Sequence, residues 1–340
     1  MSNRTGVLEK RPFMFWMFLL AALMVTREAV SAEKNISAAR GPVVWYEVDP
    51  AWPQRPAGVE WDAVSGIAVD RDDRVWVFTR AEPPIQVYGA DGRFLRGFGQ
   101  DVIAKAHHIK IGPAGGVWVT DVANHTVIRF SPTGQVLLEL GTRGEAGDDE
   151  HHFNMPTDVA ITPDGDFFVS DGYGNHRVVH FDQHGKFLNS WGKAGNGPGE
   201  FETPHAIALD SKGGIYVADR SNARVQVFDR HGKHLDTWSN SIVPWGFAVT
   251  QQDEIWVCGS SAMPLGEGDA MLGVPPKDQL FAKFAADGRL LQLWTVPKGA
   301  DGQEKPGELN WVHAMAIDSQ GNIYAGDING RRAQKFVRHE

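Results

Sequence analysis

The chain has 340 residues, 42% of them hydrophobic and 22% charged, a soluble composition long enough for one large domain or two smaller ones. The formal net charge of −9 argues against a nucleic-acid partner, because binding to phosphate requires a basic surface. The single cysteine, Cys258, excludes an internal disulfide.

Residues 1–32 are predicted to be a secretory signal. A basic start over 4–11 precedes an apolar run over 12–25, and Val30-Ser31-Ala32 is a suitable cleavage motif. The alternative is a retained N-terminal anchor, but the apolar run is short for a membrane span. We therefore expect a flexible leader over 33–41 and export to the periplasm or the exterior, with no stable membrane span after cleavage.

Residues 42–340 hold six copies of one repeat. Each copy has a short apolar strand, a polar turn, a strand with an aromatic residue, a third strand, a glycine turn and a fourth strand. The turn glycines supply the positive φ that such hairpins need. In five copies these glycines are Gly92, Gly134, Gly185, Gly232 and Gly288.

Four strands per repeat and six repeats predict an all-β fold, a six-bladed β-propeller. The sixth copy lacks its fourth strand. We expect the segment 43–48 to pair with the last blade and close the ring, which removes an open sheet edge. Long connections over 142–156, 193–204, 259–280 and 296–312 are predicted to share one face, where function is expected.

The residue just before each first strand is a histidine in alternate copies. Alternate blades of a six-fold ring lie a third of a turn apart, so three imidazoles should meet on the axis. Three neutral imidazoles with one open position suit catalytic Zn²⁺, although other divalent metals accept the same ligands. In chain order, the residues just before the six first strands are Ser65, His107, Thr157, His205, Trp245 and His313.

The other histidines break this register. His108, His151 and His152 are predicted to be solvated or to support the three axial imidazoles from outside. Six more are predicted to lie on the surface: His125, His176, His180, His184, His231 and His234.

The ends of the second strands carry further polar residues towards the same face. Arg80 and Arg220 come from opposite blades, and arginine suits a carboxylate through two parallel hydrogen bonds. The alternative is that each pairs with a nearby acid, such as Glu82 or Asp219. Tyr173 is a candidate base, or a packing residue with a wet hydroxyl. The aspartates at equivalent positions are predicted to bind loop amides: Asp121, Asp171, Asp219 and Asp327.

From about residue 65 to 336 the chain resembles NHL-repeat propellers, and in particular peptidyl-α-hydroxyglycine α-amidating lyase. The stretches that carry the resemblance are Trp118-Val-Thr-Asp-Val-Ala-Asn-His125, Phe153-Asn-Met-Pro-Thr-Asp-Val159, Val169-Ser-Asp-Gly-Tyr-Gly-Asn175, Pro204-His205 and Ala218-Asp219-Arg220. The resemblance implies Zn²⁺ bound by His107, His205 and His313. It also implies a catalytic Tyr173 and substrate-binding Arg80 and Arg220.

The chain departs from that family at several positions. The resemblance implies a structural Ca²⁺ held by the carbonyls of Ile67 and Ile109 and by an aspartate, but Ala314 stands at the aspartate position. Losing the only carboxylate argues against a calcium site. Trp311 replaces a methionine near the active site, and Gly174 and Tyr216 replace two cysteines of the family's disulfides.

The resulting prediction is a monomeric, exported, zinc-dependent lyase. It would split an α-hydroxyglycine C–N bond in a small-molecule or peptide substrate with a carboxylate, releasing an amide and glyoxylate. The alternative is a non-catalytic NHL propeller that binds a protein or small ligand. A propeller lactone hydrolase is disfavoured, because its channel acids and asparagines are absent from the axial positions here.

Overall fold

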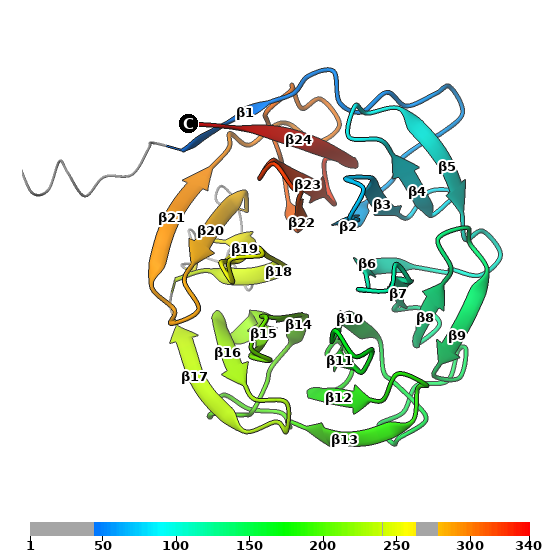
Figure 1. The fold of residues 1–340 in the computed structure, drawn as a ribbon, viewed down its shortest axis with the longest axis vertical. Coiled ribbons are helices and arrows are strands. Elements are labelled where there is room, and N and C mark those ends of the chain that lie inside the picture. Colours follow the sequence, from blue (N-terminus) through cyan, green and yellow to red (C-terminus); the bar gives the residue numbers. More distant parts are fainter. Residues whose placement is uncertain (1–43, 240, 263–277) are drawn as a thin grey trace, which may run out of the picture. The chain divides into compact units, whose positions relative to one another are not determined.

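The chain folds into six four-stranded antiparallel sheets arranged around a central axis (Figure 1). The computed structural model describes residues 44–239, 241–262 and 278–340. The predicted signal over 1–32 and the leader over 33–41 lie outside the described residues. Among the described residues, no helix is long and apolar enough to cross a membrane. The predicted all-β six-bladed propeller is confirmed.

The first three blades follow one another in sequence, each from its innermost to its outermost strand. The first blade is β2 (Val64–Val69), β3 (Val75–Thr79), β4 (Ile85–Tyr88) and β5 (Phe94–Phe98). The second is β6 (Ala106–Ile111), β7 (Val117–Asp121), β8 (Thr126–Phe130) and β9 (Val136–Leu140). The third is β10 (Pro156–Ile161), β11 (Phe167–Asp171), β12 (Arg177–Phe181) and β13 (Phe187–Trp191).

The next two blades repeat this order, and the last blade draws on both ends of the described chain. The fourth is β14 (Pro204–Leu209), β15 (Ile215–Asp219), β16 (Arg224–Phe228) and β17 (His234–Ser239), with the short 3-10 helix η1 (Arg220–Asn222) after β15. The fifth is β18 (Val243–Val249), β19 (Ile255–Ser260), β20 (Leu280–Phe284) and β21 (Leu290–Thr295). The sixth is β22 (Val312–Ile317), β23 (Ile323–Asp327), β24 (Arg332–His339) and β1 (Trp45–Val48).

The strand β1 lies beside β24 at the outer edge of the last sheet. The N-terminal segment therefore supplies the fourth strand that the sixth repeat lacks, and the last blade has no unpaired third strand. Closing a propeller with a strand from the other end of the chain removes an edge that could pair with another molecule.

The core lies between neighbouring blades and is rich in aromatic rings. Between the second and third blades, Trp118 packs on Phe167 with ring centroids 4.5 Å apart, and Phe153 is buried beside them. Between the fifth and sixth, Trp294 packs on Phe336 with ring centroids 5.5 Å apart. Large aromatic side chains bury much apolar area per residue, so a ring of small sheets gains a continuous core.

Each innermost strand has a bulge at the residue that faces the site. The register against the second strand shifts between Val64 and Gly66 in the first blade, and at the equivalent place in the other five. A bulge re-aims the side chain of the extra residue. The six bulges contain the axial residues Ser65, His107, Thr157, His205, Trp245 and His313.

Candidate metal centre and active site

The imidazoles of His107, His205 and His313 form a nearly equilateral triangle on the axis. Their ring centroids lie 4.9 Å apart for His107 and His205, and 4.8 Å apart for the other two pairs. All three side chains are buried. The structure therefore brings together the three histidines that the repeat register selected, although they lie about a hundred residues apart in the chain.

Each of these histidines makes the same hydrogen bond to the next blade. Nδ1 of His107, His205 and His313 lies 2.6, 2.7 and 2.6 Å from the carbonyl oxygens of Thr157, Trp245 and Ser65, respectively. A carbonyl can only accept, so each Nδ1 is the donor and carries the hydrogen of the neutral ring. The lone pair is thereby left on each Nε2, which is the atom available to a metal.

Burial keeps the three rings in the neutral form that a metal requires. It lowers the pKa of His107 and His205 well below the usual value, and neighbouring imidazolium charge would lower both further. It also lowers the pKa of His313 to about 3, despite the opposing hydrogen bond to Ser65. At neutral pH the site therefore offers three uncharged nitrogen donors.

The hydroxyl of Tyr173 lies against the same point. Its oxygen is 3.0 Å from Nε2 of His107 and 3.0 Å from Nε2 of His205. Burial raises the pKa of the phenol, while the cations of Arg220 and Arg80 act in the opposite direction. The phenol is thus a proton-transfer group at the open side of the triangle, next to positive charge that favours its ionised form.

The two arginines flank Tyr173 and have no acidic partner in the part of the chain that the structure describes. Nη1 of Arg220 lies 3.5 Å from the Tyr173 oxygen, and Nε of Arg80 donates to the Ala106 carbonyl at 3.3 Å. Asp219 pairs with Arg224 instead, at 2.8 Å. The guanidinium groups are therefore free to bind an anionic ligand.

Two tryptophans form an aromatic wall beside the triangle. The rings of Trp245 and Trp311 meet edge to face at 4.8 Å, and Trp245 lies 5.3 Å from His205. The Arg220 guanidinium lies over the Trp245 ring at 4.7 Å, which holds this long side chain in place. The indole nitrogen of Trp311 is buried without a hydrogen-bond partner in the described chain.

His108 lies inside this cluster, so of its two predicted roles the solvated one is wrong and the structure places it against an axial imidazole. It is only 2% exposed, and its Nδ1 lies 2.9 Å from Nδ1 of His107. A second set of three histidines could also hold a metal: one ring nitrogen from each of His107, His108 and His313 lies within 4.8 Å of the other two. His108 Nδ1 lies 3.2 Å from the Thr157 carbonyl that His107 also contacts. We favour His205 over His108, because Nε2 of His205 lies 3.0 Å from the Tyr173 oxygen and its Nδ1 has a carbonyl of its own.

Among the remaining histidines, His180 corrects a second expectation. It is buried at 7% exposure and stacks on Phe168 at 4.1 Å, rather than lying on the surface. His180 belongs to β12, in which every residue after Arg177 is buried. His151 is exposed, and His152 bonds Asp149 on a surface loop.

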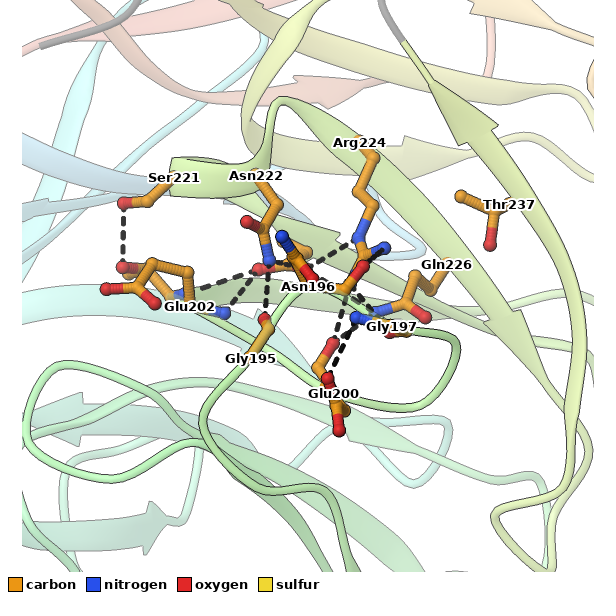
Figure 2. Close-up of polar contacts among 12 residues, drawn as sticks. Gly195, Asn196, Gly197, Glu200, Glu202, Ser221, Asn222, Arg224, Gln226 and Thr237 are labelled. Atoms are coloured by element: carbon orange, nitrogen blue, oxygen red, sulfur yellow. Dashed lines mark hydrogen bonds and ion pairs between the residues drawn. The ribbon is translucent and has the colours of Figure 1, made fainter.

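The aspartates at the second-strand ends hold the loops that surround the site, as predicted. Asp219 accepts the N–H groups of Glu202 and Thr203, at 2.9 and 3.2 Å. Arg224 spans the same loop by donating to carbonyls of Asn196, Gly197 and Glu200 (Figure 2). Since Arg220 directly follows Asp219, this network holds the backbone that carries it. The other aspartates bind loop amides likewise: Asp121, Asp171 and Asp327.

Comparisons with known proteins agree with the propeller fold. A family model, DUF5128, described as a 6-bladed beta-propeller, matches residues 146–260. A Caenorhabditis elegans protein named as a probable peptidyl-alpha-hydroxyglycine alpha-amidating lyase is 30% identical over 188 residues, covering 47% of this chain and 54% of that protein. The chain is a six-bladed β-propeller that resembles the amidating lyases.

Other relatives extend the comparison. The mouse peptidyl-glycine alpha-amidating monooxygenase is 35% identical over 194 residues, covering 47% of this chain but only 20% of that protein. The human NHL repeat-containing protein 3 is 34% identical over 195 residues, covering 53% of this chain and 56% of that protein. A solved streptogramin B lyase, 13% identical with a TM-score of 0.57 over 87% of this chain and 98% of that chain, shares the fold alone.

Because the axial imidazoles are buried, we expect the free energy of unfolding to depend on pH. Their folded-state pKa is lowered, so below about pH 6.5 the unfolded state binds protons that the folded state does not. Stability should therefore be full above pH 6.5 and fall as the pH drops towards the folded values. In metal-free protein, His205→Gln should flatten this slope by about 1.4 kcal/mol per pH unit.

Urea unfolding between pH 7 and pH 5 would measure these slopes. The matched control is His231→Gln, because His231 is an exposed histidine on an outer turn. That variant should keep the wild-type slope. Equal slopes for the His205 and His231 variants would contradict the prediction.

Proposed function

We propose that the protein is a zinc-dependent lyase of the peptidyl-α-hydroxyglycine α-amidating type. It would convert an N-acyl-α-hydroxyglycine into an amide and glyoxylate. The observation that supports this most is the convergence of three Nε2 atoms, one phenol and two arginines without acidic partners on one point of the axis. Nitrogen-only ligands with an open side suit Zn²⁺ rather than a hard cation such as Ca²⁺ or Mg²⁺.

His107, His205 and His313 would hold the zinc through Nε2, with their orientation set by the three backbone carbonyls. The donor set fits the ion, because three neutral imidazoles, with ring centroids 4.8 to 4.9 Å apart, each keep the Nε2 lone pair that zinc binds. A bound zinc lowers the pKa of a hydroxyl group that it ligates.

In the proposed reaction, Tyr173 accepts the proton of the substrate hydroxyl. The C–N bond then breaks with its electron pair moving to nitrogen, the carbinol carbon becomes the aldehyde of glyoxylate, and the proton passes to the amide nitrogen. Arg80 and Arg220 bind the carboxylate, which orients the C–N bond and keeps the negative charge away from the phenol. Proton, atoms and electrons balance without a co-substrate.

The assay is direct. Zinc-loaded protein incubated with α-hydroxyhippurate should release glyoxylate and benzamide in equal amounts, at a rate well above the uncatalysed reaction. The same preparation of His205→Ala is the control. Release no faster than this control would reject the proposed activity for this substrate class.

The second candidate is a non-catalytic NHL propeller that binds a protein or small ligand. The similarity to human NHL repeat-containing protein 3 favours it, since that name implies no reaction. A zinc-loaded protein that binds α-hydroxyhippurate without releasing glyoxylate would support this candidate instead.

A further inference from the structure

The innermost strands carry very small side chains at two positions, which follow the axial residue by one and by three. The close approach of neighbouring blades explains this: a Cβ on Gly66 would meet the Ile109 nitrogen at 2.9 Å, and one on Gly246 would meet the His313 carbonyl at 2.9 Å. Nine such positions are small: Gly66, Ala68, Ala160, Ala206, Ala208, Gly246, Ala248, Ala314 and Ala316. The exceptions are His108, Lys110 and Asp158.

Two of these exceptions form an ion pair within the ring of innermost strands. Nζ of Lys110 lies 3.1 Å from Oδ2 of Asp158, whose side chain is completely buried, while that of Lys110 is 22% exposed. Lys110 lines a central cavity to which all six innermost strands contribute. Figure 1 shows these strands, β2, β6, β10, β14, β18 and β22, surrounding the axis.

The surroundings of Asp158 indicate that its carboxyl group is ionised. Oδ1 accepts the N–H of Val159 at 2.9 Å, and Oδ2 accepts the N–H of Ile207 at 3.1 Å as well as the Lys110 ammonium. Burial raises the pKa of Asp158, but the partners seen around both oxygens are donors, which a protonated carboxyl could not fully use. The pair joins strands β6, β10 and β14.

These residues do not fit the calcium that the resemblance implies. At the aspartate position, Ala314 is buried and offers no oxygen ligand. The carboxylate of Asp158 already accepts three hydrogen bonds. Lys110, which carries a positive charge, directly follows Ile109, whose carbonyl was an expected calcium ligand. A divalent cation placed there would be repelled by the lysine and would lack negatively charged ligands.

We propose that the Lys110 ammonium is the cation of this channel and takes the place of a calcium ion. The Lys110–Asp158 pair joins three of the six innermost strands. Asp158 directly follows Thr157, whose carbonyl orients His107. This part of the channel is therefore held together without a calcium ion. This inference does not depend on the proposed lyase activity.

The first test measures calcium binding to the wild-type protein. Metal-free and zinc-loaded samples are each titrated with CaCl2 by calorimetry, and their melting temperatures are recorded with and without calcium. We expect no saturable binding heat and no shift of the melting temperature in either sample. Stoichiometric calcium binding, or stabilisation by calcium, would overturn the proposal.

The second test is a double-mutant cycle of Lys110→Met and Asp158→Asn, which keeps side-chain volume while removing charge. Lys110→Met alone leaves a buried carboxylate without its cation and should lower the melting temperature by about 5 °C or more. Adding Asp158→Asn should restore part of that loss. If Lys110→Met does not fold, Asp158→Asn and the double variant still show whether the two changes interact.

Lys283→Met is the matched control. Lys283 also forms an ion pair, with Glu254 at 3.0 Å, but Glu254 is 33% exposed rather than buried. Its loss should change the melting temperature very little. A Lys110→Met variant as stable as this control, or additive effects in the cycle, would show that the pair does not hold the channel. Glyoxylate release is a separate measurement, so the two proposals can fail independently.

Discussion

Replacing His205 by alanine should abolish tight zinc binding. Losing an outer hydrogen bond to a metal ligand commonly weakens binding by about 10–100-fold, and losing the ligand itself should cost more than that. The remaining imidazoles of His107 and His313 would leave half of a tetrahedral site to water. Competition with a zinc-binding dye, followed by metal analysis, would measure the affinity and the stoichiometry of about one zinc per chain in the wild type.

The control for this experiment is His231→Ala. His231 lies on an exposed turn between the third and fourth strands of the fourth blade, far along the blade from the axial bulge. Its loss should leave zinc affinity unchanged. His108→Ala distinguishes between the two possible ligand sets, because this variant should still bind one zinc if His205, and not His108, is the third ligand. Loss of zinc from the His108 variant with retention in the His205 variant would assign the site to His107, His108 and His313.

Replacing Tyr173 by phenylalanine should lower kcat for glyoxylate release by about 10²–10⁴-fold, the usual contribution of a positioned proton-transfer group. The ring keeps its packing between His107 and His205, so zinc content and stability should stay near the wild-type values. The loss should therefore appear in kcat more than in KM. Steady-state kinetics with metal analysis of the same samples would measure both.

Tyr46→Phe is the matched control, because Tyr46 lies in the outer strand β1 and stacks on Trp294. It should retain full activity. Replacing Arg220 by methionine should instead raise KM and lower kcat/KM by about 10–150-fold, since charge-assisted hydrogen bonds to the carboxylate are lost. A fully active Tyr173→Phe variant would remove the phenol from the mechanism and leave only the zinc and the arginines.

The repeat register was the most reliable guide to the candidate site. It predicted that His107, His205 and His313 meet, because a residue at one fixed place in a repeat occupies one fixed place in the ring. Arg80, Tyr173 and Arg220 follow from the same reasoning, since they leave the ends of equivalent strands. The repeat register could not reveal the hydrogen bonds that orient the imidazoles, since each acceptor carbonyl belongs to the next blade.

The errors came from side chains whose surroundings are set by neighbouring strands or blades. His108 follows His107, and a strand pattern alone does not decide which way its side chain points, so the sequence left open whether it is solvated or supports the axial imidazoles. One signal was present: His108, Lys110 and Asp158 interrupt a series of glycines and alanines at the inner positions. His180 was placed on the surface because its strand is far from the axis, yet Phe168 covers its ring.

The sequence by itself determined the six-fold repeat, the order of strands in each blade and the alternate placement of three histidines. These are periodic and local properties, so they can be read one repeat at a time. Only the tertiary structure decided which nitrogen of each histidine is free, where the Lys110 ammonium lies and which rings wall the site. These features depend on carbonyls and side chains that approach across blade boundaries, from residues between 40 and 248 positions apart in the chain. Such contacts are set by the closing of the ring, which no single repeat encodes.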